Sequence, residues 1–169
     1  PARVDTDAFD ALLEELARAL FVLGDSAASL EAYREAAAVI PADPPTAERA
    51  RAVSGMGQIT MLLARYDESR TLCEEAVGIA RSIGARQAEG HAMSTLGLDL
   101  AVLGDPSGVA MLETAIEIAH EVRNADDIGR GYVNLAEACN LTGDTRRAAE
   151  VTREGLRVAD ETGIASSYG

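Results

Sequence analysis

The chain has 169 residues, enough for one domain with its own core, and its formal charge of −13 disfavours binding to nucleic acid or to an anionic membrane surface. All 15 basic residues are arginine, and without lysine the phosphate-binding loop G-x-x-x-x-G-K-[ST] cannot occur. Aromatic residues make up 4%, and neither an 18-residue apolar run nor a secretory leader is visible, so we expect a cytoplasmic protein with a core of alanine and aliphatic side chains.

Apolar residues recur with the spacing of amphipathic helices, in a composition rich in alanine, leucine, glutamate and arginine, all strong helix formers. Pro41 ends one helical segment because proline cannot continue a helix, and Gly84 and Gly163 stand where helix C-caps belong. In chain order, the predicted helices span 7–23, 26–40, 46–63, 67–83, 86–102, 107–122, 126–141 and 145–162.

Three segments with the same pattern at a helix end occur in the chain: LARALFVLGD (16–25), LGLDLAVLGD (96–105) and LAEACNLTGD (135–144). The turn residues Gly24, Ala64, Gly104 and Gly143 are 40, 40 and 39 residues apart, a period typical of a solenoid. Small residues recur seven positions before each turn, and again after it: Ala17, Gly57, Gly97 and Ala136, then Ala36, Ala76, Ala115 and Gly155. Helices can cross closely at such positions while bulky neighbours such as Leu16, Met56, Leu96 and Leu135 fill the grooves beside them.

The period predicts one all-α domain over residues 1–169, with repeats at about 7–41, 46–84, 86–124 and 126–163. SIGARQAEG (82–90) and ETGIASSYG (161–169) align at a spacing of 79, so the last residues look like the start of a fifth repeat. We therefore expect a fragment of a longer array, whose exposed repeat ends can form a homodimer.

The stretches SLEAYREAAAVIP (29–41) and MGQITMLLARYDESRTLCEEA (56–76) resemble tetratricopeptide repeats, although these repeats are about six residues longer than the standard one. The resemblance implies a right-handed α-solenoid of four hairpins. Residues 130–163 are similar to segments of the large ATP-binding transcription regulators of the LuxR type. That similarity implies a non-catalytic sensing or partner-binding region; the alternative is a stand-alone adaptor that binds a peptide segment of another protein.

In tetratricopeptide repeats the first helix of each hairpin lines a concave groove, and the resemblance implies that a protein, peptide or small effector binds there. Arg51, His91 and Arg130 each stand thirteen residues before their turn, so they would form a row able to hold an acidic peptide or carboxylate. The candidate groove residues are Arg51, Ser54, Gln58, His91, Ser94, Arg130 and Asn140. The alternative is that these are ordinary solvated residues on a wide surface.

Candidate catalytic groups are sparse, and we expect no enzyme, cofactor or metal site. His91 and His120 fall on different helices, and neither has a second ligand at helical spacing. An enzyme would need a deep pocket that pairs His91 with a carboxylate, for which the sequence gives no support. Cys73 and Cys139 fall on apolar helix positions and are expected to be buried thiols. The acidic groups Asp5, Asp7 and Asp10, and Asp126 and Asp127, stand at helix starts, where they would act as caps.

Overall fold

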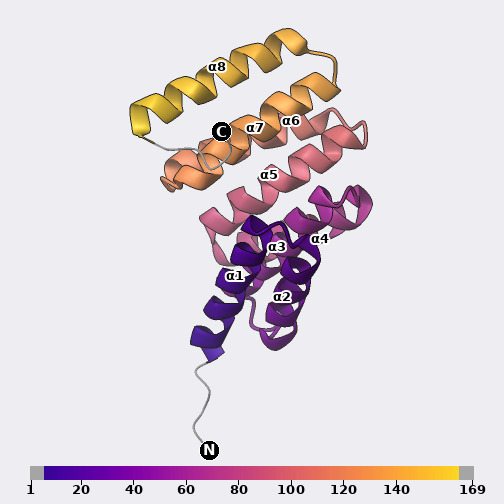
Figure 1. The fold of residues 1–169 in the computed structure, drawn as a ribbon, viewed down its shortest axis with the longest axis vertical. Coiled ribbons are helices and arrows are strands. Elements are labelled where there is room, and N and C mark those ends of the chain that lie inside the picture. Colours follow the sequence, from indigo (N-terminus) through magenta and orange to yellow (C-terminus); the bar gives the residue numbers. More distant parts are fainter. Residues whose placement is uncertain (1–5, 164–169) are drawn as a thin grey trace, which may run out of the picture.

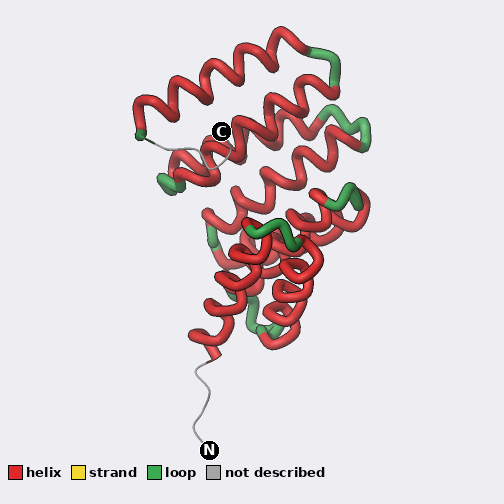
Figure 2. Tube along the Cα trace, viewed as in Figure 1, coloured by secondary structure: helices red, strands yellow, loops and turns green. Residues whose placement is uncertain are grey.

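The computed structural model describes residues 6–163, with side chains for Leu13 and from residue 15 onward. Asp5 and the predicted start of a fifth repeat at 164–169 lie outside the described residues, as do the side chains of Asp7 and Asp10. The helices are α1 (Thr6–Val22), α2 (Ser26–Val39), α3 (Ala47–Leu62), α4 (Tyr66–Ile83), α5 (Arg86–Val102), α6 (Ser107–Glu121), α7 (Ala125–Leu141) and α8 (Thr145–Thr162). Every regular element in this part of the chain is a helix, so the predicted all-α class is confirmed, with each boundary within one residue (Figures 1 and 2).

The repeated glycine–aspartate pair ends one helix and starts the next. Gly24, Gly104 and Gly143 have φ of 82–85°, the left-handed conformation that glycine adopts without a Cβ clash. The next residue donates its N–H five residues back, as from Asp25 to the Leu20 carbonyl at 2.9 Å, which satisfies a carbonyl at the helix end. The side chain of Asp25 then caps α2 by accepting from the Ala28 N–H at 3.0 Å.

The four hairpins stack in chain order from α1–α2 at one end to α7–α8 at the other (Figure 1). The first helices of the hairpins, α1, α3, α5 and α7, contact one another in succession and form an inner layer. The backbones of the second helices, α2, α4, α6 and α8, pack only against first helices within the described residues, so they form a more widely spaced outer layer. This two-layer arrangement is the solenoid that the repeat period predicts.

Small residues lie where the two layers cross. The clearest case is the α5–α6 crossing, where a Cβ on Gly97 would lie 2.9 Å from the Gly108 carbonyl oxygen and 2.7 Å from Leu112 Cγ. Ala17, Ala36 and Ala76 are fully buried at the corresponding places in other hairpins. Leu16 departs from the expected pattern and is 49% exposed, because α1 contacts only α2 and α3 in the described chain.

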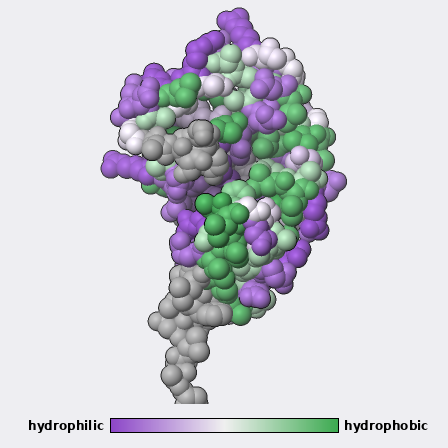
Figure 3. Space-filling view, viewed as in Figure 1, coloured by the Kyte–Doolittle hydropathy of each residue, from purple (hydrophilic) through white to green (hydrophobic). Residues whose placement is uncertain are grey.

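Apolar side chains are not confined to the core, and Figure 3 shows a band of them on the front face, beside mainly hydrophilic surface. Several exposed apolar residues end the first helices, where each chain turns into the second helix: Val22, Leu23, Leu62, Leu63, Leu103 and Leu141. Within residues 6–163 no helix is both long and apolar enough to cross a membrane.

Candidate functional site

The seven residues predicted to line the groove do not form one exposed row. Arg51 and Asn140 are exposed, and Gln58 is half-buried. Of the other four, Ser54, Ser94 and Arg130 are buried and the His91 side chain is 30% exposed. His91, Ser94 and Arg130 make hydrogen bonds between α5 and α7. Arg51 pairs with Glu48 at 3.2 Å on its own helix. The structure therefore brings together His91 and Arg130, while Arg51 engages a neighbour elsewhere.

His91 and Arg130 belong to a polar cluster between α5 and α7, together with Thr95 and Asp127. His91 Nδ1 lies 2.7 Å from Asp127 Oδ1. Arg130 donates from Nη1 to Thr95 Oγ1 at 3.0 Å, and from Nη2 to the His91 carbonyl at 2.9 Å and to Asp127 Oδ1 at 3.1 Å. These bonds tie together equivalent positions of two successive first helices, because His91 and Arg130 are 39 residues apart.

His91 Nδ1 lies between a hydrogen-bond acceptor and a hydrogen-bond donor. Nδ1 also lies 2.9 Å from Arg130 Nη2, which can only donate, whereas the Asp127 carboxylate can only accept. Nδ1 thus faces one donor and one acceptor, and which of the two it bonds depends on the tautomer of the ring. Burial and the charge of Arg130 lower the pKa of His91, although Asp127 favours its protonation. Burial alone would raise the pKa of Asp127, but its hydrogen bond with His91 and the charge of Arg130 outweigh burial and lower it.

These contacts bear on three of the expectations. Arg130 does not offer its charge to the groove because its guanidinium is used inside the protein, and His91 is neutral at pH 7. His91 does have a carboxylate partner, Asp127, although no sequence spacing indicates one. Asp126 and Asp127 lie in the first turn of α7, at the expected helix start, while the N-cap is Asn124, which accepts from the Asp127 N–H at 3.0 Å. No sequence spacing pairs His91 with Asp127 in advance, because they meet only through the stacking of two repeats.

Two other buried groups complete the interfaces between repeats. Asn134 donates to the Ser94 carbonyl at 3.2 Å and to Ser94 Oγ at 3.1 Å. Ser94, another of the predicted groove residues, is therefore hydrogen-bonded inside the protein. Asp99, on α5, is fully buried, and its Oδ2 lies 2.6 Å from Ser69 Oγ on α4. Burial raises the pKa of Asp99 to about 7, against the opposing effect of its hydrogen bond with Ser69.

The two cysteines are free and buried, as predicted. Burial, with the nearby charge of Asp99, raises the pKa of Cys73 to about 12, so its thiol is not a nucleophile at neutral pH. His120 lies exposed on α6, and its ring meets the Tyr132 ring edge-on at a centroid distance of 6.2 Å. The two histidines thus have different neighbours and different roles in packing.

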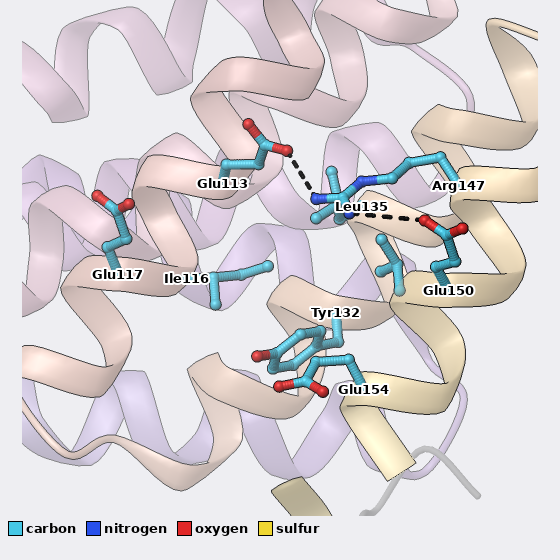
Figure 4. Close-up of a pocket in the computed structure, with 9 residues that line it drawn as sticks. Glu113, Ile116, Glu117, Tyr132, Leu135, Arg147, Glu150 and Glu154 are labelled. Carbon is cyan, nitrogen blue, oxygen red and sulfur yellow. Dashed lines mark hydrogen bonds and ion pairs between the residues drawn. The ribbon is translucent and has the colours of Figure 1, made fainter. Parts of the chain in front are cut away.

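An open cleft of about 480 Å³ lies on the outer layer, between α6 and α8 and above α7 (Figure 4). Its apolar floor consists of Ile116, Leu135 and Val151, and Tyr132 lies beside that floor. One wall carries Glu113 and Glu117 from α6, and the other carries Arg147, Glu150 and Glu154 from α8. The cleft is of the size that binds small ligands or side chains, and its charge is strongly negative.

Arginine side chains neutralise part of the negative charge of the cleft. Arg147 reaches across the cleft, with Nη2 3.2 Å from Glu113 Oε1 and Nη1 4.0 Å from Glu150 Oε2 (Figure 4). Arg157 pairs with Glu154 at 2.5 Å from the same helix, α8. Glu117 makes no ion pair within the described residues. One carboxylate of the cleft is therefore available to a ligand, and a second is shared only with its own helix.

Comparison with solved structures identifies the class of fold. The chain superimposes on aspartyl phosphate phosphatase F from Bacillus subtilis with a TM-score of 0.75 and 13% identity, covering 97% of this chain and 43% of that one. A Rap protein complexed with competence and sporulation factor gives a TM-score of 0.77 and 14% identity, covering 90% of this chain and 43% of that one. TPR-like repeats of a kinesin light chain protein from Podosopora anserina give 0.65 and 17%, covering 90% and 75%.

These likenesses, with eight helices packed as consecutive hairpins, make the fold a tetratricopeptide-like solenoid. The chain spans less than half the length of the first two of these structures. No protein-family model and no curated protein matches its sequence. At 13–17% identity the solved structures define the fold alone, so function rests on this chain's own residues.

Proposed function

We propose that this chain is a non-catalytic repeat module that binds a segment of a protein partner. The observation that carries the proposal is the open cleft between α6, α7 and α8, which combines an apolar floor with charged walls. A groove of this kind gives a peptide both buried area and fixed polar contacts. A similar fold solved in complex with competence and sporulation factor supports a binding role for such a solenoid.

The inner layer is the less favourable surface for an acidic ligand. Its central helix, α5, is buried from Ala88 to Ala101 except at His91. The groups predicted to hold a carboxylate, His91 and Arg130, bond to Asp127 and to each other's helix. A ligand on that face would have to break these bonds, whereas the cleft on the outer layer is already open.

The binding proposal can be tested by selecting peptides from a displayed random library on the purified, immobilised full chain. We expect enrichment of peptides that bind the wild type and the control Glu74→Trp, but not Glu117→Trp, because the new ring blocks the cleft wall. Glu74 is a suitable control because it is exposed on α4, outside the cleft. Bound peptides should be recovered with unchanged mass, as expected of a non-catalytic module.

Failure to enrich any peptide would refute the binding proposal. Equal binding to Glu117→Trp would leave a binding module whose site is elsewhere, and a change in peptide mass would refute its non-catalytic character.

At a finer level, we propose that the module is the sensing or partner-binding region of a bacterial transcription regulator. The similarity of residues 130–163 to regulators of the LuxR type supports this role. The alternative is a stand-alone adaptor. Sequencing the parent gene on both sides separates the two: a phosphate-binding loop upstream and a helix-turn-helix downstream support the regulator, and a stop codon after one capping helix supports the adaptor.

A further inference from the structure

Opposing carboxylates on the two walls of the cleft form two successive pairs, which we call the first and second rungs. The first rung is Glu113 on α6 and Glu150 on α8, and the guanidinium of Arg147 lies between them. The second rung is Glu117 and Glu154, each four residues, or about one helical turn, farther along its helix. The protein itself thus shows how a guanidinium bridges the two walls.

The second rung has no such bridge. Glu117 makes no ion pair in the described part of the chain. Glu154 pairs with Arg157, and Arg157 also pairs with Glu161 at 2.6 Å, all three on α8. Between the walls lies the ring of Tyr132, beside the Glu154 carboxylate (Figure 4). A second cation in the cleft would therefore meet two carboxylates and an aromatic face.

We propose that the second rung binds an arginine side chain of the partner segment, an inference that rests on the proposed function. The planar guanidinium stacks on the Tyr132 ring and donates to Glu117 and Glu154, as the Arg147 guanidinium donates to Glu113 in the first rung. The apolar floor packs against the methylene stem of the same side chain. Arginine fits better than lysine because a forked donor can reach both walls at once.

The test uses the full chain and two acetylated pentapeptides, one with a central arginine between alanines and one with citrulline, its uncharged isostere, in that place. Binding is followed by shifts of the amide and tyrosine-ring NMR signals. We expect the arginine peptide to bind at least about tenfold more tightly than the citrulline peptide, with shifts centred on Tyr132. The affinity should fall at high salt because the rung is exposed to solvent.

Variants then assign the site. Glu117→Gln and Glu154→Gln should each weaken the arginine peptide several-fold, whereas Glu74→Gln, the same change on α4, should have no effect. Glu117→Gln is the sharper variant because Glu117 is exposed and unpaired, so the fold does not depend on it. Equal binding of both peptides, unchanged binding by Glu117→Gln, or no shift at millimolar concentrations would overturn the inference. Library peptides without arginine that still bind would refute only this inference, whereas no binding peptide at all would refute the proposed function as well.

Discussion

At the scale of single residues, the buried carboxyl of Asp99 has an unusual set of neighbours. Ser69 Oγ lies 2.9 Å from the Gly57 carbonyl and 2.6 Å from Asp99 Oδ2, but a hydroxyl has only one proton to donate. If Ser69 donates to the carbonyl, Asp99 must be protonated and donate to Ser69. The other oxygen, Oδ1, has no hydrogen-bond partner within the described residues. Geometry and the pKa of about 7 thus both favour a neutral carboxyl in the folded chain.

Asp99 should therefore make stability fall as the pH rises. Its pKa is raised from 3.8 to about 7 on folding, so its favourable contribution is complete below pH 4 and is lost as the pH approaches 7. The loss is roughly 1.4 kcal/mol per pH unit within this window, and a few kcal/mol in all at most. Asp99→Asn keeps a donor for Ser69 and removes the ionisation. We expect this variant to be more stable than the wild type at pH 8, with a smaller gain at pH 5, as measured by urea denaturation.

The comparison with Asp99→Asn isolates this residue from other titrating groups. The lowered pKa of His91 works in the opposite direction, since its contribution is lost as the pH falls through the pKa values of its unfolded and folded states. His91 is present in both proteins and cancels in the difference. Parallel stability curves for the two proteins from pH 5 to 8 would contradict a raised pKa for Asp99.

The residue scale is also where sequence analysis was weakest. The small residues at helix crossings and the buried cysteines follow from helical spacing alone. The His91–Asp127 bond does not, because it depends on how far α7 is rotated and shifted against α5. Its spacing predicts that Arg130 lines the groove, but the stacking of repeats places its guanidinium in the interface between α5 and α7, where the side chain is 6% exposed.

At the scale of helices, the turn at Ala64 is the exception among the four hairpins. Ala64 has a φ of 59° in the position that glycine occupies in the other three turns. An alanine in this conformation costs about 1 kcal/mol or more relative to glycine, because its Cβ crowds the following carbonyl. We therefore expect Ala64→Gly to stabilise the protein by roughly 1 kcal/mol in thermal or urea denaturation.

Ala149→Gly provides the matched control for this substitution. Ala149 is exposed inside α8, where glycine is expected to cost about 1 kcal/mol through backbone entropy. The two identical changes should have opposite signs. If Ala64→Gly also destabilises the protein, the left-handed turn does not limit its stability.

Substitutions at two glycines, Gly97 and Gly78, distinguish the effect of close helix crossing from the effect of helix propensity. A Cβ at Gly97 would press on the Gly108 carbonyl oxygen and on Leu112, whereas a Cβ at Gly78 meets nothing within 4 Å. We expect Gly97→Ala to destabilise the protein by about 1–3 kcal/mol, since α5 and α6 must move apart. Gly78→Ala should instead stabilise it by up to about 1 kcal/mol, because alanine favours helix. Equal effects in chemical denaturation would show that the α5–α6 crossing tolerates a methyl group.

At the scale of the whole molecule, the period of the sequence was enough to predict the stacked hairpins but not the cleft. Each hairpin is specified locally by caps, turns and small crossing residues, all of which can be read along the chain. The cleft depends on the gap between α6 and α8, which are separate in sequence and whose backbones do not pack against each other in the described chain, although Arg147 and Glu113 meet across it. In the sequence, the glutamates of its walls look like ordinary surface residues. They face one another only because of the spacing between α6 and α8 in the outer layer.

Stability should also be uneven along the solenoid, because each helix is held mainly by its neighbours. The backbone of α5 packs against α3, α4, α6 and α7, whereas the backbone of α8 packs only against α7 in the described residues. We expect native-state hydrogen exchange of the full chain to be slowest in α5, where amides open only with global unfolding, and fastest in α8, where they open locally.

The same experiment at several protein concentrations tests the predicted homodimer. Protection of α1 or α8 that rises with concentration would support pairing through a repeat end, and α8 amides as slow as those of α5 at every concentration would contradict the local-opening prediction.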